Sequence, residues 1–79
     1  MTPEAQAEMI RGMVAGLSDR LAAGGGTPAE WARLVAAYGV LQDKPAAADA
    51  WARAQAALAA DPEALEKVRA AAVQAGVAQ

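Results

Sequence analysis

The feature that most constrains this chain is a pair of helical apolar stripes between residues 31 and 58. In both stripes, large apolar or alanine residues recur at spacings of three and four. A repeat of this period places its members on one face of an α-helix. The two stripes therefore predict two amphipathic helices joined by a short turn. Their members are Trp31, Leu34, Val35, Tyr38 and Leu41, followed by Ala47, Trp51, Ala54 and Leu58.

The order of residue types in these stripes resembles a tetratricopeptide repeat. Trp31 is followed by leucine three residues on, tyrosine seven on, and alanine sixteen and twenty-three on. In that motif, small residues let two helices approach closely and large residues fill the space between them. The chain departs from the motif where Val35 replaces the usual glycine and where the usual proline comes late, at Pro62. The resemblance implies a helix hairpin.

Signals for the starts of helices are spread along the whole chain. A capping residue followed by proline occurs at Thr2, Thr27 and Asp61, and this pair typically opens a helix. Glu30, three residues after Thr27, completes a capping box. No strand pattern competes. These signals predict an all-α fold of four short antiparallel helices, at about residues 3–23, 28–41, 45–60 and 62–75.

Glycines divide the expected helices and raise two further questions. Three glycines at 24–26 precede Thr-Pro rather than Lys-Ser or Lys-Thr, so they indicate a C-cap and turn and not a phosphate-binding loop. Gly76 is a second expected C-cap, with the next residue folded back over the last turn. Gly12 and Gly16, four residues apart, indicate either a surface where another helix approaches closely or small residues tolerated in a helix.

A thin core is expected, because alanine makes up about a third of the chain and contributes little apolar area. Two tryptophans and one tyrosine should therefore fill much of the interior. We expect residues 1–79 to form one helical domain. The expected core residues are Met13, Leu17, Leu21, Trp31, Leu34, Tyr38, Leu41, Ala47, Trp51, Ala54 and Leu58.

Charge argues against several classes of partner. The net charge is −2, with both signs interspersed, whereas a nucleic-acid-binding domain usually has a basic patch. A helix-turn-helix DNA reader at 28–41 and 45–60 is disfavoured for the same reason. No apolar run approaches the ~18–20 residues of a membrane span, and no secretory signal follows Met1. We therefore expect neither nucleic-acid binding nor membrane contact from these residues.

Catalytic chemistry has few residues to use. Histidine and cysteine are absent, so Ser18 has no imidazole to activate it. Glu63 and Glu66 are better explained as solvated charges near the start of a helix. Met9 and Met13 indicate core filling rather than a cofactor site. We expect no catalytic, metal or cofactor-binding residues, and no enzyme activity.

A binding surface is the remaining possibility. In a tetratricopeptide repeat, the first helix of the pair lines the concave side, and such a groove suits an amphipathic helix. The alternative is that the helix at 3–23 already fills this groove, or that the chain is a generic structural or oligomerisation segment with no peptide ligand. The expected groove residues are Ala29, Ala32, Arg33, Ala36 and Val40.

A more specific resemblance covers nearly the whole chain. Residues 9–21 read MIRGMVAGLSDRL, residues 31–41 read WARLVAAYGVL, and residues 70–77 read AAAVQAGV. Together these segments resemble the C-terminal periplasmic region of the CcmI (CycH) family of c-type cytochrome biogenesis factors. The chain departs from that family in having one recognisable repeat.

The resemblance implies a function and a location. Members of that family are anchored in the membrane by N-terminal helices, so these 79 residues would be part of a larger protein. Their periplasmic repeat domain holds apocytochrome c through its C-terminal helix and presents it to the haem-ligation components. The implied protein is a chaperone-like holder at the periplasmic face of the bacterial inner membrane, without a cofactor of its own.

Overall fold

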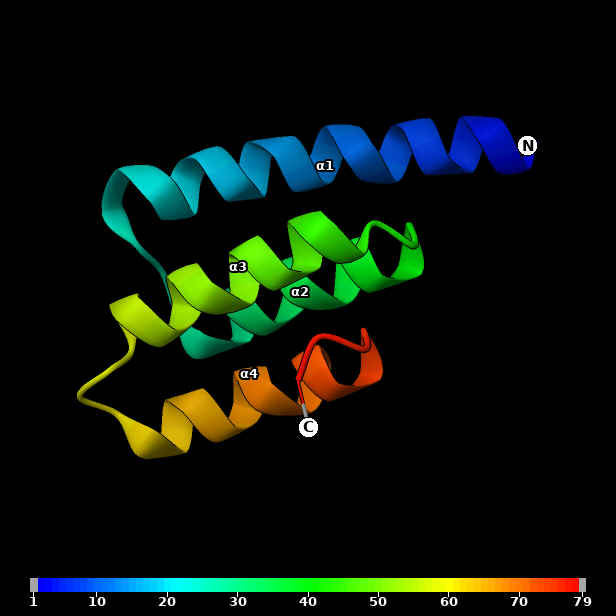
Figure 1. Cartoon of the computed structure of the whole chain (residues 1–79). Coiled ribbons are helices and arrows are strands. Elements are labelled where there is room, and N and C mark those ends of the chain that lie inside the picture. The colour runs from blue at the N-terminus through cyan, green and yellow to red at the C-terminus, as the bar shows by residue number, and fades with distance from the viewer. Residues whose placement is uncertain (1, 79) are drawn as a thin grey trace.

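Four helices make up the computed structural model, which describes residues 2–78 (Figure 1). These residues form no strand, so the all-α prediction is confirmed. Each boundary lies within one residue of the expected one, except the end of the third helix. The helices are α1 (Pro3–Gly24), α2 (Pro28–Val40), α3 (Lys44–Ala57) and α4 (Pro62–Gln74).

Each helix begins at a capping side chain that is followed by proline at one of the first two helical positions. The Thr2 hydroxyl accepts a hydrogen bond from the Ala5 N–H at 3.1 Å, and the Asp61 carboxylate accepts one at 3.2 Å. Asp43, expected as part of the turn, also proves to be an N-cap. These bonds satisfy backbone donors that a helix start otherwise leaves without partners.

Two glycines end α1 and α4, as expected. Gly25 has φ of 73° and donates its N–H to the Leu21 carbonyl at 2.8 Å. Gly76 has φ of 81°, and the Val77 N–H reaches back to the Ala72 carbonyl at 2.9 Å. Positive φ is a conformation that glycine adopts without a steric penalty, and the second arrangement is a Schellman cap.

The expected end of α3 at residue 60 is wrong. The helix stops at Ala57, and residues 58–60 form turns. Pro62 disfavours the helical conformation for the residue before it, and Asp61 accordingly adopts an extended φ of −128° as the N-cap of α4. The chain must therefore leave α3 before Asp61 to enter the next helix.

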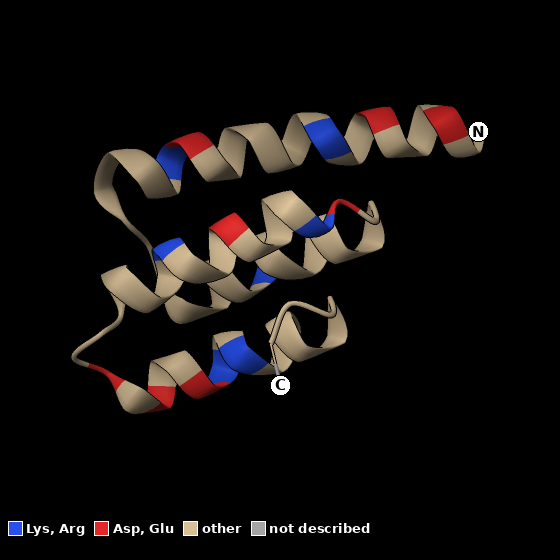
Figure 2. Ribbon diagram, in the orientation of Figure 1, with Lys and Arg blue, Asp and Glu red and all other residues tan. Residues whose placement is uncertain are grey.

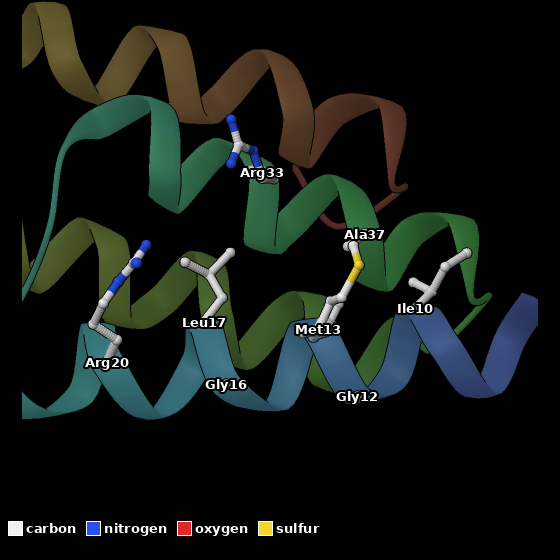
Figure 3. Close-up of a pocket in the computed structure, with 9 residues that line it drawn as sticks. Ile10, Gly12, Met13, Gly16, Leu17, Arg20, Arg33 and Ala37 are labelled. Atoms are coloured by element: carbon white, nitrogen blue, oxygen red, sulfur yellow. The ribbon is translucent and has the colours of Figure 1, made fainter.

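Helix α2 lies at the centre of the molecule and contacts each of the other three helices. Consecutive helices run in opposite directions, so α2 and α4 run in the same direction side by side (Figure 1). Helix α1 lies along the other edge of α2. One face of α2, between α1 and α4 and on the side away from α3, is consequently not covered by another of these helices (Figure 3).

All four helices contribute to one hydrophobic core. Six of the eleven expected core residues are buried, namely Leu21, Trp31, Leu34, Ala47, Trp51 and Ala54. Four others are half-buried, namely Leu17, Tyr38, Leu41 and Leu58. Buried residues outside the expected set are Val14, Val35, Ala50, Ala64, Val68 and Ala72.

The expected burial of Met13 is wrong, because its side chain is 67% exposed. Its neighbour Val14 is buried, and adjacent residues point about 100° apart around a helix. Helix α1 packs mainly along α2, so a narrow stripe suffices to hold it. Met13 lies beside that stripe rather than within it.

Helices α2 and α4 come very close together near their C-terminal ends. A Cβ atom added to Gly39 would lie 2.9 Å from the Cβ of Ala75, which is too close for any side chain without movement. About two turns earlier in α4, Val68 is fully buried. Helix α4 is therefore a full part of the core.

Two arginines cover the two indole rings. The Arg53 guanidinium lies 5.7 Å from the centre of the Trp31 ring, and that of Arg69 lies 5.6 Å from the Trp51 ring, within cation–π range. Arg53 also donates hydrogen bonds to the carbonyl and hydroxyl oxygens of Ser18, at 3.3 and 3.2 Å. Arg53 of α3 therefore lies over Trp31 of α2 and is hydrogen-bonded to Ser18 of α1.

Candidate functional site

A surface hollow of about 360 Å³ lies between α1 and α2. We call it the α1–α2 groove. Figure 3 shows it in close-up, with side chains of α1 pointing toward α2. Its lining residues are Ile10, Gly12, Met13, Val14, Gly16, Leu17 and Arg20 of α1, with Arg33 and Ala37 of α2.

The middle of the groove is apolar. Ile10, Met13 and Leu17 project from α1, and Met13 reaches toward Ala37 on the opposite wall (Figure 3). From Ile10 to Arg20 the groove follows α1 for about 15 Å, or three helical turns. The dimensions therefore match a short helical segment.

Two exposed methionines lie on the α1 side of the groove. Met13 is 67% exposed and Met9, one turn earlier, is 50% exposed. Methionine is flexible and polarisable, and it is frequent on surfaces that bind partners by adapting to them. Apolar surface of this kind beside a groove is typical of an interaction site.

One end of the groove is cationic. Arg20 comes from the last turns of α1 and Arg33 from the first half of α2. Arg20 forms an ion pair with Glu30, while Arg33 extends from α2 on the side away from α1 (Figure 3). Arg20 thus places a guanidinium at one end of the groove, and Arg33 adds a second arginine on the α2 wall near Leu17 (Figure 3).

Glu30 is held in place by the start of α2. Its carboxylate accepts a hydrogen bond from the Thr27 N–H at 3.0 Å, and the Thr27 hydroxyl accepts one from the Glu30 N–H at 3.2 Å, so the expected capping box is confirmed. The Thr27 N–H, and then the charge of Arg20, hold the pKa of Glu30 below its ordinary value. Glu30 therefore remains ionised at neutral pH.

The expected groove residues on α2 do not form a single site. Arg33 lines the α1–α2 groove. Ala36 and Val40 line a smaller hollow of about 210 Å³ between α2 and α4. Ala29 is exposed and lines neither hollow, while Ala32 is half-buried against the core.

Helix α1 does not cover this face of α2. Ala29, Arg33 and Ala36 are exposed, and Val40 is 70% exposed. The alternative in which the first helix fills the groove is therefore wrong for this structure. Instead, α1 forms one wall of the α1–α2 groove.

Sequence reasoning missed the contribution of α1 to this site. Met13 and Leu17 were expected in the core, and so not as part of a binding surface. Gly12 and Gly16 also line the groove, and a Cβ atom on either would meet nothing within 4 Å. No helix among residues 2–78 approaches closely at these two glycines.

Residues 2–78 contain no group of three or more acidic, histidine or cysteine side chains that could hold a metal ion. The Ser18 hydroxyl accepts a hydrogen bond from Arg53, and the Glu66 Oε1 lies 3.5 Å from the Arg69 Nε. None of the described helices has the length and hydropathy needed to span a membrane. The groove can bury apolar surface and pair with charge.

Comparisons with known proteins add no family to this picture. A scan against family models, a search of curated proteins and a search of solved structures find no match to the chain.

Proposed function

We propose that this chain is a protein-interaction module that holds an amphipathic helix of a partner protein in the α1–α2 groove. The observation that carries the proposal is the groove itself, an open apolar channel of about 360 Å³ beside a methionine that is 67% exposed. Covering this surface with an apolar partner would remove it from water, which is the main driving force for such association.

A helix is the occupant that fits best. The groove is bounded by two antiparallel helices, and helix surfaces pack by inserting the ridge of one into the groove of another. Its apolar side chains at Ile10, Met13 and Leu17 extend over about two turns of α1. A guest with apolar residues at similar spacing could contact all three.

The arrangement of the helices also supports a tetratricopeptide-like interpretation. Helices α2 and α3 form an antiparallel hairpin, and α4 lies beside α2 in the same direction (Figure 1), as the first helix of a following repeat would. Combined with the resemblance to the CcmI family, this suggests a specific guest. We propose that the guest is the C-terminal helix of an apocytochrome c, held at the periplasmic face of the inner membrane for haem attachment.

A binding titration tests this proposal. The probe is a fluorescent peptide from an apocytochrome c C-terminal helix, with a scrambled peptide of the same composition as control. Met13→Gln keeps the length of the side chain but removes its apolar surface, so we expect it to weaken binding several-fold. Val73, 46% exposed on α4 and outside the groove, supplies the matched control Val73→Gln, which should bind normally.

Two results would contradict the proposal. One is absence of saturable binding by protein whose circular dichroism shows it folded. The other is equal binding by the Met13→Gln and Val73→Gln variants. Sedimentation on the same samples would show whether a second copy occupies the groove instead, in which case the structural and oligomerisation alternative would replace the peptide-binding one.

A further inference from the structure

We infer that the partner helix of the α1–α2 groove is acidic at one end of its apolar stripe, and that the groove selects it through Arg20 and Arg33. This inference rests on the proposed function and adds the charge and the polarity of the ligand. It follows from where the charged residues lie and not from the overall charge, because the whole chain has a net charge of −2.

The groove concentrates positive charge. Its lining includes two arginines and no acidic residue. Glu30, beside the groove, accepts a hydrogen bond from Thr27 and pairs with Arg20, so the two lining arginines outnumber this one neighbouring carboxylate. Arg20 is still 63% exposed, and Arg33 is exposed as well, so an incoming carboxylate could reach either.

The carboxylates of α1 lie on other sides of the helix. Figure 2 shows acidic residues along α1 and at the start of α4. At about 100° per residue, Glu4, Glu8 and Asp19 each lie at least about 120° around the axis from Met13. All three are exposed. The residues that line the groove therefore carry a net positive charge, although the whole chain has a net charge of −2.

This distribution specifies the ligand. Ile10, Met13 and Leu17 would contact the apolar stripe of the guest, and Arg20 and Arg33 would meet its end near the start of α2. The matching ligand is an amphipathic helix with aspartate or glutamate about one turn beyond its last apolar residue. Charge complementarity of this kind sets partner choice and register more than total affinity.

Three designed peptides test the inference. Each is a helix of about 14 residues, long enough to span the groove, with one leucine stripe. They differ only at the end of the stripe, which carries two glutamates, two glutamines or two lysines. We expect the acidic peptide to bind at least about three-fold more tightly than the neutral one at low salt, since exposed ion pairs are modest. The lysine peptide should bind most weakly, and 1 M salt should reduce the differences.

Variants of the protein separate groove charge from total charge. Arg33→Glu should abolish the preference for the acidic peptide, and Arg33→Gln should reduce it. Arg11→Glu makes the same change in net charge, but Arg11 lies about 160° around α1 from Met13 and is exposed. This control should keep the preference.

The outcomes distinguish this inference from the function on which it rests. Equal binding of the acidic and neutral peptides, or an equal effect of Arg11→Glu and Arg33→Glu, would overturn the charge selection and leave helix binding intact. Failure of all three peptides to bind the folded protein would overturn both.

Discussion

Val68 and Val73 allow the packing of α4 to be tested with one substitution made at two places on the same helix. Val68 is fully buried in the core cluster, whereas Val73 is 46% exposed. Replacing either with alanine removes the same two methyl groups. Alanine is also the better helix former at both positions, so this gain cancels when the two variants are compared.

The expected difference between the variants is large for so small a domain. Two buried methyl groups account for about 1.6 kcal/mol of transfer free energy, and the cavity left behind adds to this. We therefore expect Val68→Ala to lower the free energy of unfolding by about 2–3 kcal/mol. Val73→Ala should change it by no more than about 0.5 kcal/mol.

Urea denaturation followed by circular dichroism at 222 nm measures both values, and thermal melts provide a second readout. In a domain of this size, 2 kcal/mol corresponds to a fall in Tm of roughly 8–16 °C. If the two variants unfold at the same urea concentration, α4 is not packed through Val68. The placement of α4 against α2 would then be wrong.

Four further predictions each concern a single residue. Trp51→Ala should cost about 3–5 kcal/mol, because the ring is only 8% exposed; a near-neutral change in the melting temperature would place the indole at the surface. Gly39→Ala should destabilise the protein, since its Cβ would lie 2.9 Å from that of Ala75. Gly12→Ala should stabilise it by about 0.5–1 kcal/mol, because the added Cβ meets nothing within 4 Å. If Gly39→Ala proved the more stable of the two variants in urea melts, the packing assigned to both glycines would be contradicted. Because the folded-state pKa of Glu30 is lowered, its stabilising effect is present above its ordinary pKa and is lost as the pH falls through the lowered one. The Glu30→Gln variant should therefore lose less stability than the unchanged protein as the pH falls. Identical curves of unfolding free energy against pH for the two proteins would refute this prediction.

Local signals in the sequence predicted the helices well because capping depends on neighbours within four residues. The capping box of Thr27 and Glu30 is one case, and the cap at Gly76 is another. A local signal failed at the end of α3, because the alanine-rich stretch at 58–60 favours helix but forms turns.

The tertiary contacts of α1 and α4 could not be predicted in the same way. Periodicity shows that a stripe exists, but the number of neighbouring helices decides how wide the buried part is. Helix α1 lies at an edge of the molecule, so Met13 is exposed. Helix α4 lies against α2, so even its small residues Ala64 and Ala72 are buried.

The candidate site differs from the groove that the sequence predicts. Arg33 lines the α1–α2 groove, whereas the sequence places it on the exposed side of the first helix of a repeat pair. The sequence could not show that α1 supplies most of that groove, because contacts between residues 10–20 and 33–37 depend on how two helices pack. Ala36 and Val40 consequently line a different hollow.

The position of a bound helix on the protein is the most direct test of the central claim. Amide chemical shifts of ¹⁵N-labelled protein can be followed during titration with the acidic leucine-stripe peptide. The account predicts the largest changes at Ile10, Met13, Leu17, Arg33 and Ala37, with little change on the exposed face of α3 at Ala52 and Gln55. Changes centred on α3, or spread evenly over the molecule, would contradict it.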